Sequence, residues 1–317
     1  MNPQNFNAPT LSVVIGTLNR CDSLPRAIDS LLRQDCPADR VEIIVVDNGS
    51  TDATADVAKA YSAQHLRVRY VLEPKLGLSN ARNAGIANAR GAFVGFFDDD
   101  ATAEPQWAAT VLSIIDSDPE VGAIGGPIVV EWPSGKPDWM PPTREGYYGH
   151  CDYGPTRRLL TYPEYPFGSN MIIRRERLTR IGGLRDSVGP KGKNMMSAGE
   201  QDLFMRLTAD PLRIVYDPAA VVHHWIFANQ VTKQWLMRRS MKHGLSNTRM
   251  MNVIHAGRRG YWLILGSLAA WRCAVGALSG SVAWLRRQPS VVVTSRFATM
   301  MYWNGIVRGS FANLFAR

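Results

Sequence analysis

The sequence predicts an α/β protein with a mostly parallel central sheet, followed by a helical, basic C-terminal extension. Over roughly the first hundred residues, apolar runs of strand length alternate with helical patterns, which is typical of βαβ units. Three of the first four predicted strands end in polar or acidic residues. The chain has no Asp or Glu after Asp217, and its last hundred residues carry thirteen Lys or Arg and six of the nine tryptophans.

Residue periodicity predicts each element in turn. Strands are expected where apolar, largely β-branched or aromatic runs occur, at 11–15, 41–46, 68–72 and 92–97. Helices are expected where apolar residues recur at helical spacing, at 23–33, 53–61 and 79–89. Later elements are a helix from 105 to 116, strands at 121–130, 167–174 and 214–224, and a helix at 200–210. Residues 132–166 and 184–199 have no clear period, so they are expected to be irregular and either functional or flexible.

Composition restricts the class of protein. Of the 317 residues, 45% are hydrophobic and 20% charged, as in an ordinary globular protein. The four cysteines are far apart and form no CxxC pair, so neither a disulfide framework nor a zinc site is expected, and a reducing compartment fits. The first ten residues lack an apolar core, so no secretory signal is expected. We expect a polar tail over 1–9, a main domain over 10–245 and the extension over 246–317.

Three consecutive carboxylates follow the fourth predicted strand, in the run Phe97-Asp98-Asp99-Asp100. Asp98 and Asp100 are two residues apart, so an extended backbone places both on one side. Two hard oxygen ligands on one side suit Mg²⁺ or Mn²⁺, whose coordination is usually completed by substrate phosphates. A solvated acidic loop would account for the same residues.

The other strand ends also carry polar side chains. Thr17, Asn19 and Arg20 follow the first strand, and Asp47 follows the second. In a parallel sheet these ends lie along one edge, where α/β proteins bind ligands. Asp47 is placed to accept hydrogen bonds from a base or ribose, although its neighbours also suit a helix-capping turn. Arg82, just inside a predicted helix, either faces a pyrophosphate or is solvated.

In order and spacing, several motifs resemble those of the family 2 glycosyltransferases, which have the GT-A fold. The matching segments are 12–20, 45–52, 77–91, 97–100, 168–171, 182–183, 199–203 and 216–224. The resemblance implies a GT-A domain over 10–245. It also implies an inverting enzyme of cell-surface polysaccharide biosynthesis, which moves a sugar from a nucleotide-sugar donor, UDP-linked by expectation, to an acceptor hydroxyl.

The resemblance implies roles for individual residues. Those expected to contact the nucleotide are Thr17, Asn19, Arg20, Asp47, Arg82, Asp98 and Asp99. Those expected to hold a divalent cation, Mn²⁺ or Mg²⁺, are Asp100, Asp98 and His224. A histidine packed beside His223 is the alternative for His224. The loop expected to line the sugar or acceptor pocket contains Gly168, Ser169 and Asn170.

The catalytic base is expected in the acidic motif Glu200-Gln201-Asp202. The resemblance places Glu200 at the base position, where Asp is usual, and Asp202 two residues later. The dipole at a helix start favours an ionised carboxylate, although Glu200 could instead cap the helix. Retention of this motif with Asp98 and Asp100 argues against an inactive sugar- or lipid-binding protein.

Two other enzyme classes are disfavoured by the loop after the first strand. A dinucleotide-dependent oxidoreductase needs G-x-G-x-x-G there, and only Gly16 is present. A sugar-nucleotide pyrophosphorylase, the nearer alternative, would normally carry a Gly-rich loop with Lys or Arg, which the sequence lacks at this place. No recognised nucleic-acid-binding motif accompanies the basic tail.

The basic extension predicts a membrane partner. Residues 261–285 are apolar apart from Arg272 and a few serines, and arginine pairs flank them. This segment is long enough to span a bilayer, but Arg272 near its middle would cost about 2.5–3.5 kcal/mol there. We expect a peripheral helix on an anionic membrane at the cytoplasmic face, near a lipid-linked or glycan acceptor. One alternative is an integral, membrane-spanning helix. The other is a helix that packs on the main domain or on a second copy of the chain in a homodimer.

Overall fold

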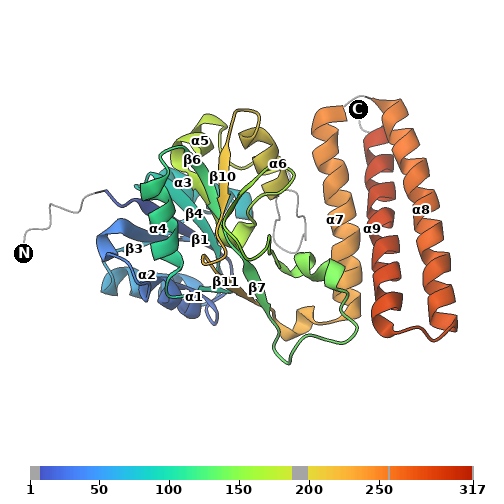
Figure 1. Ribbon diagram of the computed structural model, residues 1–317, viewed down its shortest axis with the longest axis horizontal. Helices are drawn as coiled ribbons and strands as arrows, with labels where there is room; N and C mark the ends of the chain where they lie inside the picture. The colour runs from blue at the N-terminus through green and yellow to red at the C-terminus, as the bar shows by residue number, and fades with distance from the viewer. Residues whose placement is uncertain (1–7, 188–198, 256–257, 316–317) are drawn as a thin grey trace, which may run out of the picture. The chain divides into compact units, whose positions relative to one another are not determined.

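The computed structural model describes residues 8–187, 199–255 and 258–315 (Figure 1). The chain divides into two compact units. The first comprises Met1–Val130, Gly149–Asp186 and Leu203–Trp225, and the second comprises Glu131–Tyr148, Ser187–Asp202 and Ile226–Arg317. The loop expected at 184–199 lies mostly outside the described residues.

The first unit is built on an eight-stranded sheet. Its strands are β1 (Leu11–Thr17), β2 (Val41–Asp47), β3 (Val68–Leu72), β4 (Phe93–Asp98), β6 (Val121–Gly125), β8 (Arg158–Leu160), β9 (Met171–Arg174) and β10 (Arg213–Tyr216). The order across the sheet is β3-β2-β1-β4-β9-β6-β10-β8. β1 is parallel to β2 and β4, and β2 is parallel to β3, while β9 is antiparallel to β4 and β6. The predicted mostly parallel α/β sheet is confirmed.

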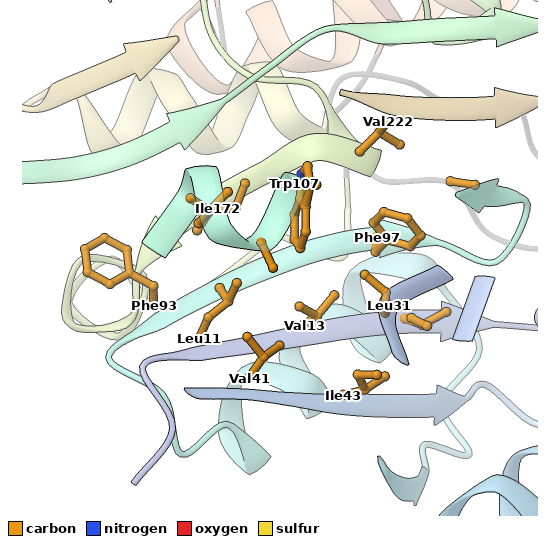
Figure 2. Close-up of a cluster of buried hydrophobic side chains, with 14 of the residues drawn as sticks. Leu11, Val13, Leu31, Val41, Ile43, Phe93, Phe97, Trp107, Ile172 and Val222 are labelled. Atoms are coloured by element: carbon orange, nitrogen blue, oxygen red, sulfur yellow. The ribbon is translucent and has the colours of Figure 1, made fainter. Parts of the chain in front are cut away.

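Helices cover both faces of this sheet. They are α1 (Leu24–Leu32), α2 (Thr54–Gln64), α3 (Leu78–Asn88), α4 (Trp107–Ser117), α5 (Arg175–Arg180) and α6 (Gly199–Leu207). α1, α2 and α4 share one hydrophobic core with the sheet, in which Val13, Phe97 and Trp107 are labelled in Figure 2. α3, α5 and α6 share a second core, which includes Val14. Strands buried on both faces are apolar at nearly every position, which made β1 and β2 recognisable from sequence.

All three of the later strands are shorter than expected, and the one expected at 167–174 begins only at Met171. The strand expected at 121–130 is interrupted at Pro127 and the one expected at 214–224 at Pro218, because proline has no backbone N–H to donate to a ladder. The segments beyond these prolines enter a second, three-stranded sheet. Its strands, in order, are β5 (Ala101–Ala103), β11 (Val222–Trp225) and β7 (Ile128–Glu131). β5 was not predicted, and its pairing with β11 positions part of the site described below.

The second unit is helical, as predicted for the C-terminal extension. Its elements are η2 (Pro142–Tyr148), η4 (Ala228–Gln230), α7 (Lys233–His255), α8 (Arg259–Leu285) and α9 (Ser290–Phe315). α9 packs against both α7 and α8 (Figure 1). Gly244 of α7 and Gly305 of α9 each lie against the backbone of the other helix, where a Cβ would not fit. Among the described helices, α8 is the one long and apolar enough to cross a membrane, judged by length and composition.

Candidate active site

Polar residues lie at the carboxyl ends of three adjacent strands in the first unit. Thr17 pairs with Asp47 across β1 and β2, and Gly16 pairs with Asp98 across β1 and β4. Thr17 and Asp47 are buried. The three strand ends are therefore level with one another at one edge of the sheet, the usual ligand-binding edge of an α/β protein.

Asp98, Asp100 and His224 form a candidate metal site at this edge. One ligand atom from each lies within 4.8 Å of the others, and His224 Nε2 is 3.1 Å from Asp100 Oδ1. β11 positions the histidine, because His224 pairs with Ala101 of β5 and the Trp225 N–H donates to the Asp100 carbonyl over 2.9 Å. Carboxylate and imidazole groups suit a divalent cation.

The charges in this cluster favour a bound cation. Burial raises the pKa of Asp99, and the charge of Asp100 adds to this rise. Burial also acts against ionisation of Asp100, but the hydrogen bond and charge of His224 outweigh it and lower the pKa of Asp100. Two arginines offset part of the negative charge: Arg20 Nε is 3.6 Å from Asp99 Oδ1, and Arg82 Nη2 is 3.4 Å from Asp98 Oδ1. A cation would offset the rest, so the donor set fits one.

Arg82 joins the acidic run to the turn expected to line the sugar pocket. The residue is buried in α3, so it is not the solvated arginine that the sequence left open. Its Nη2 lies 3.4 Å from Asp98 Oδ1 and 3.4 Å from the Gly168 carbonyl oxygen. The guanidinium group therefore helps to hold the Asp98 carboxylate in place beside this turn.

Hydrogen bonds between loops fix the positions of several residues that were expected to contact the nucleotide. Asp47 accepts from the Ser50 N–H (2.9 Å) and from the Tyr70 hydroxyl (3.2 Å). Asn19, at a positive φ of 54°, donates its N–H to Ser50 Oγ and accepts from the Thr51 N–H. The loops after β1 and β2 are thus fixed to each other. Tyr70 was missed from sequence because an aromatic residue in a predicted strand is ordinarily part of the core.

Asn170 holds the turn η3 (Gly168–Asn170) in place. Its side chain is fully buried, accepts from Trp107 Nε1 (2.9 Å) and donates to the carbonyls of Pro127 (3.1 Å) and Ala220 (2.7 Å). Both amide hydrogens are engaged by these bonds. The geometry therefore gives Asn170 a role in positioning the turn, in which Ser169 is also buried.

Gly149 fits against the imidazole ring of His224, and the sequence did not single it out. A Cβ at this position would lie 3.1 Å from His224 Nδ1, and the φ of +93° favours glycine. Gly149 belongs to the irregular segment expected at 132–166, which is rich in glycine. The sequence alone therefore could not distinguish Gly149 from the other glycines of this segment.

Glu200 and Asp202, the expected base motif, lie in the first turn of α6 and belong to the second unit. Glu200 is half-buried and Asp202 is buried. Within the second unit, burial lowers the pKa of Arg239 in α7, and the nearby charge of Glu200 opposes that shift. The first-turn position also places the negative charges where the helix dipole favours them.

Comparison with known proteins identifies the family. Residues 12–182 match the family described as Glycosyl transferase family 2. The glucosyl-dolichyl phosphate glucuronosyltransferase of Haloferax volcanii is 27% identical over 248 residues, covering 77% of this chain and 78% of that protein. The succinoglycan biosynthesis protein ExoM of Rhizobium meliloti is 27% identical over 276 residues, covering 85% of each.

Solved structures show the same fold. The mannosyltransferase PcManGT from Pyrobaculum calidifontis, in complex with GDP-Man and Mn²⁺, has a TM-score of 0.59 at 18% identity, covering 94% of this chain and 87% of that one. TarS 1–349 of S. aureus, in complex with UDP-GlcNAc, has a TM-score of 0.55 at 16% identity, covering 92% and 90%. These neighbours confirm the GT-A fold. The chain belongs to glycosyltransferase family 2 and is a glycosyltransferase.

Proposed function

We propose that this enzyme transfers a sugar from a UDP-linked donor to a hydroxyl of a lipid-linked or growing glycan during cell-surface polysaccharide biosynthesis. The observation that carries the proposal is the cluster of Asp98, Asp100 and His224 at the strand ends. Such a cluster suits a cation shared with the diphosphate of a nucleotide-sugar. The names of two relatives, which refer to succinoglycan and to a dolichyl phosphate, support an acceptor of this kind.

The residues divide into three roles. Those assigned to the nucleotide are Thr17, Asn19, Arg20, Asp47, Arg82, Asp98 and Asp99. Asp100, Asp98 and His224 would hold Mn²⁺ or Mg²⁺, which when bound offsets the negative charge on the leaving nucleotide. Those assigned to the sugar or acceptor pocket are Gly168, Ser169 and Asn170, the last by positioning the turn.

The reaction also needs a base. Glu200 accepts the proton of the acceptor hydroxyl as its oxygen bonds to the anomeric carbon. The bond from that carbon to the diphosphate oxygen breaks with its electron pair on the nucleotide. Attack from the opposite face inverts the configuration at the carbon. Asp202, buried in the same helical turn, would support Glu200.

We propose further that α8 holds the enzyme at an anionic membrane surface, with the membrane-associating part over 246–317. Ile264, Leu278 and Leu285 are 71%, 69% and 71% exposed, and Trp271 and Trp284 are exposed as well. A coiled-coil seam would be narrower and flanked by charged positions. A broad apolar face that lacks acidic residues and has arginines at both ends suits anionic lipid instead.

The test is nucleotide release by the purified full chain from a panel of UDP- and GDP-sugars, with Mn²⁺, Mg²⁺ or EDTA. The panel includes both UDP- and GDP-sugars, because one structural neighbour was solved with GDP-Man and another with UDP-GlcNAc. We expect release from a UDP-sugar that needs a divalent cation and accelerates when a lipid-linked glycan is added. Release from GDP-sugars alone would contradict the donor assignment, and release in EDTA would contradict the metal assignment.

A further inference from the structure

His224, a candidate metal ligand, occupies the last position of a short strand ladder. β11 pairs with β5 through three residue pairs, and the third pair joins His224 to Ala101. The ends of a ladder open locally more readily than its interior. A ligand at such a position needs further contacts to stay beside the acidic run.

Trp225, the next residue of β11, makes such contacts. Its backbone N–H donates to the Asp100 carbonyl over 2.9 Å, and its indole Nε1 donates to Thr102 Oγ1 over 3.1 Å. Successive side chains of a strand point to opposite faces, so the indole lies on the face of the ladder opposite His224. The two hydrogen bonds tie the end of β11 to the residues on both sides of Ala101.

Arg26 of α1 holds the indole ring from another element. Its guanidinium carbon lies 4.3 Å from the centre of the Trp225 ring, which is a cation–π contact. Burial lowers the pKa of Arg26 and the charge of Asp100 opposes that shift, so the guanidinium group is within electrostatic reach of the acidic run. Because α1 shares a hydrophobic core with the main sheet, this contact connects the end of β11 to that core.

The orientation of the His224 ring agrees with this arrangement. Its Nε2 is 3.1 Å from Asp100 Oδ1, whereas its Nδ1 is on the side of Gly149. Nε2 is therefore the ring nitrogen that faces the carboxylates. A shift at the end of β11 would move this nitrogen away from them.

We propose that Trp225 is a positioning residue of the metal site, which holds His224 beside Asp100 and thereby makes the site select Mn²⁺ over Mg²⁺. This inference rests on the proposed function, because it takes Asp98, Asp100 and His224 as the ligands of the cation. Mg²⁺ takes oxygen ligands and keeps several waters, whereas imidazole nitrogen is a ligand of transition metals. The selectivity of the site therefore depends on how firmly the imidazole is held.

Mn²⁺ binding to the full chain without nucleotide, followed by EPR with Mg²⁺ as competitor, tests this inference. Trp225→Phe keeps a ring for Arg26 but loses the indole N–H, and Thr102→Val loses its acceptor. Each should lower the affinity for Mn²⁺ by about fivefold, because the hydrogen bond between them is lost. The affinity for Mg²⁺ should change by less than about twofold. A loss of folded protein would weaken both cations equally.

A double variant and a matched control locate the effect. Trp225→Phe combined with Thr102→Val should bind Mn²⁺ about as well as either single variant, because both changes remove the same hydrogen bond. The control is Thr208→Val, since Thr208 is also half-buried and its hydroxyl also donates a hydrogen bond, but it lies outside β5 and β11. Fully additive losses, or the same selectivity in Thr102→Val and Thr208→Val, would overturn the assignment.

Pulsed EPR of the bound Mn²⁺ gives a second readout, which a merely structural role would not move. Asp98 and Asp100 supply only oxygen, so a nitrogen hyperfine coupling identifies the imidazole, and His224→Ala should abolish it. We expect the coupling in the wild type and a clear loss of its amplitude in Trp225→Ala. Because Trp225 is 36% exposed, this variant is expected to fold.

Two results would overturn the inference. One is Mn²⁺ bound to the wild type without nitrogen coupling, and the other is an unchanged coupling in Trp225→Ala. Failure of the proposed function would look different, because nucleotide release would be absent for every donor while the nitrogen coupling persisted.

Discussion

The strand-end site of the first unit and the surroundings of His243 in the second unit carry opposite charge. The first gathers Asp98, Asp99 and Asp100, which Arg20 and Arg82 offset only in part. In the second, the charges of Arg239 and Arg144 act on His243. The chain shows the same contrast at large scale, since its last hundred residues carry thirteen basic side chains and no acidic one. Carboxylates suit a cation, whereas guanidinium groups suit an anion.

The largest effect expected in the second unit comes from Glu200→Gln. The amide keeps the size of the side chain but cannot accept a proton, so turnover should fall by about a thousandfold while donor binding is retained. Steady-state kinetics and UDP calorimetry measure the two quantities. Asp202→Asn is the comparison variant, and it should lose stability more than turnover because Asp202 is buried. Near-normal turnover in Glu200→Gln with an inactive Asp202→Asn would show that the base is Asp202.

The apolar face of α8 gives the next largest effect. Changing Leu268, Leu278 and Leu285 together to Ser should weaken vesicle binding by about a hundredfold, because three exposed leucines lose their transfer into lipid. Flotation with anionic and neutral liposomes, in low and high salt, measures this. The control changes three exposed leucines of the first unit, Leu66, Leu72 and Leu159, to Ser. Equal flotation of the two triple variants would contradict the membrane assignment.

His243 should make the free energy of unfolding depend on pH. The pKa of His243 is about 4 in the folded chain against 6.5 ordinarily, so unfolding takes up a proton between these values. The free energy of unfolding should therefore fall as pH drops from 6.5 to 4, by at most about 3 kcal/mol. Denaturant melts across this range should show a flatter profile for His243→Gln. His65→Gln is the control, and a profile unchanged by His243→Gln would contradict the assignment.

The smallest expected effect is a change in Mn²⁺ affinity at the strand-end site. Gly149→Ala should weaken Mn²⁺ binding by about tenfold, because the added Cβ would press on the His224 ring. Gly154→Ala is the matched control, since its φ of +105° is equally unfavourable for alanine but no atom lies within 4 Å of the added Cβ. Both variants should lose about 1 kcal/mol of stability. Equal Mn²⁺ affinity in the two variants would show that Gly149 does not position His224.

The two regions also differ in how far the sequence predicts them. The strand ends could be predicted because buried strands such as Val41–Asp47 are apolar throughout and stop at a carboxylate. Parallel pairing then brings Asp47 level with Thr17 and Asp98 level with Gly16. The alternation of strands and helices was therefore sufficient to place these side chains along one edge.

The surroundings of His243 in the second unit could not be predicted in this way. Arg239 and His243 lie in a helix rich in exposed basic residues, where Arg238 next to them is solvated. Arg144 comes from a segment with no periodicity, and its contact with Thr299 joins residues 155 apart in sequence. Contacts of this range depend on tertiary packing, which also explains why Gly149 and the strand β5 were missed.

We propose that a divalent cation held through Asp100 recruits the donor. Calorimetry of UDP binding, with Mn²⁺ and with EDTA, tests it in the wild-type chain, in Asp100→Ala and in Asp210→Ala, where Asp210 is an exposed residue. We predict that Mn²⁺ tightens UDP binding by about a hundredfold in the wild type and in Asp210→Ala, and has no effect in Asp100→Ala. Mn²⁺-dependent UDP binding that persists in Asp100→Ala would show that the cation is not held through Asp100.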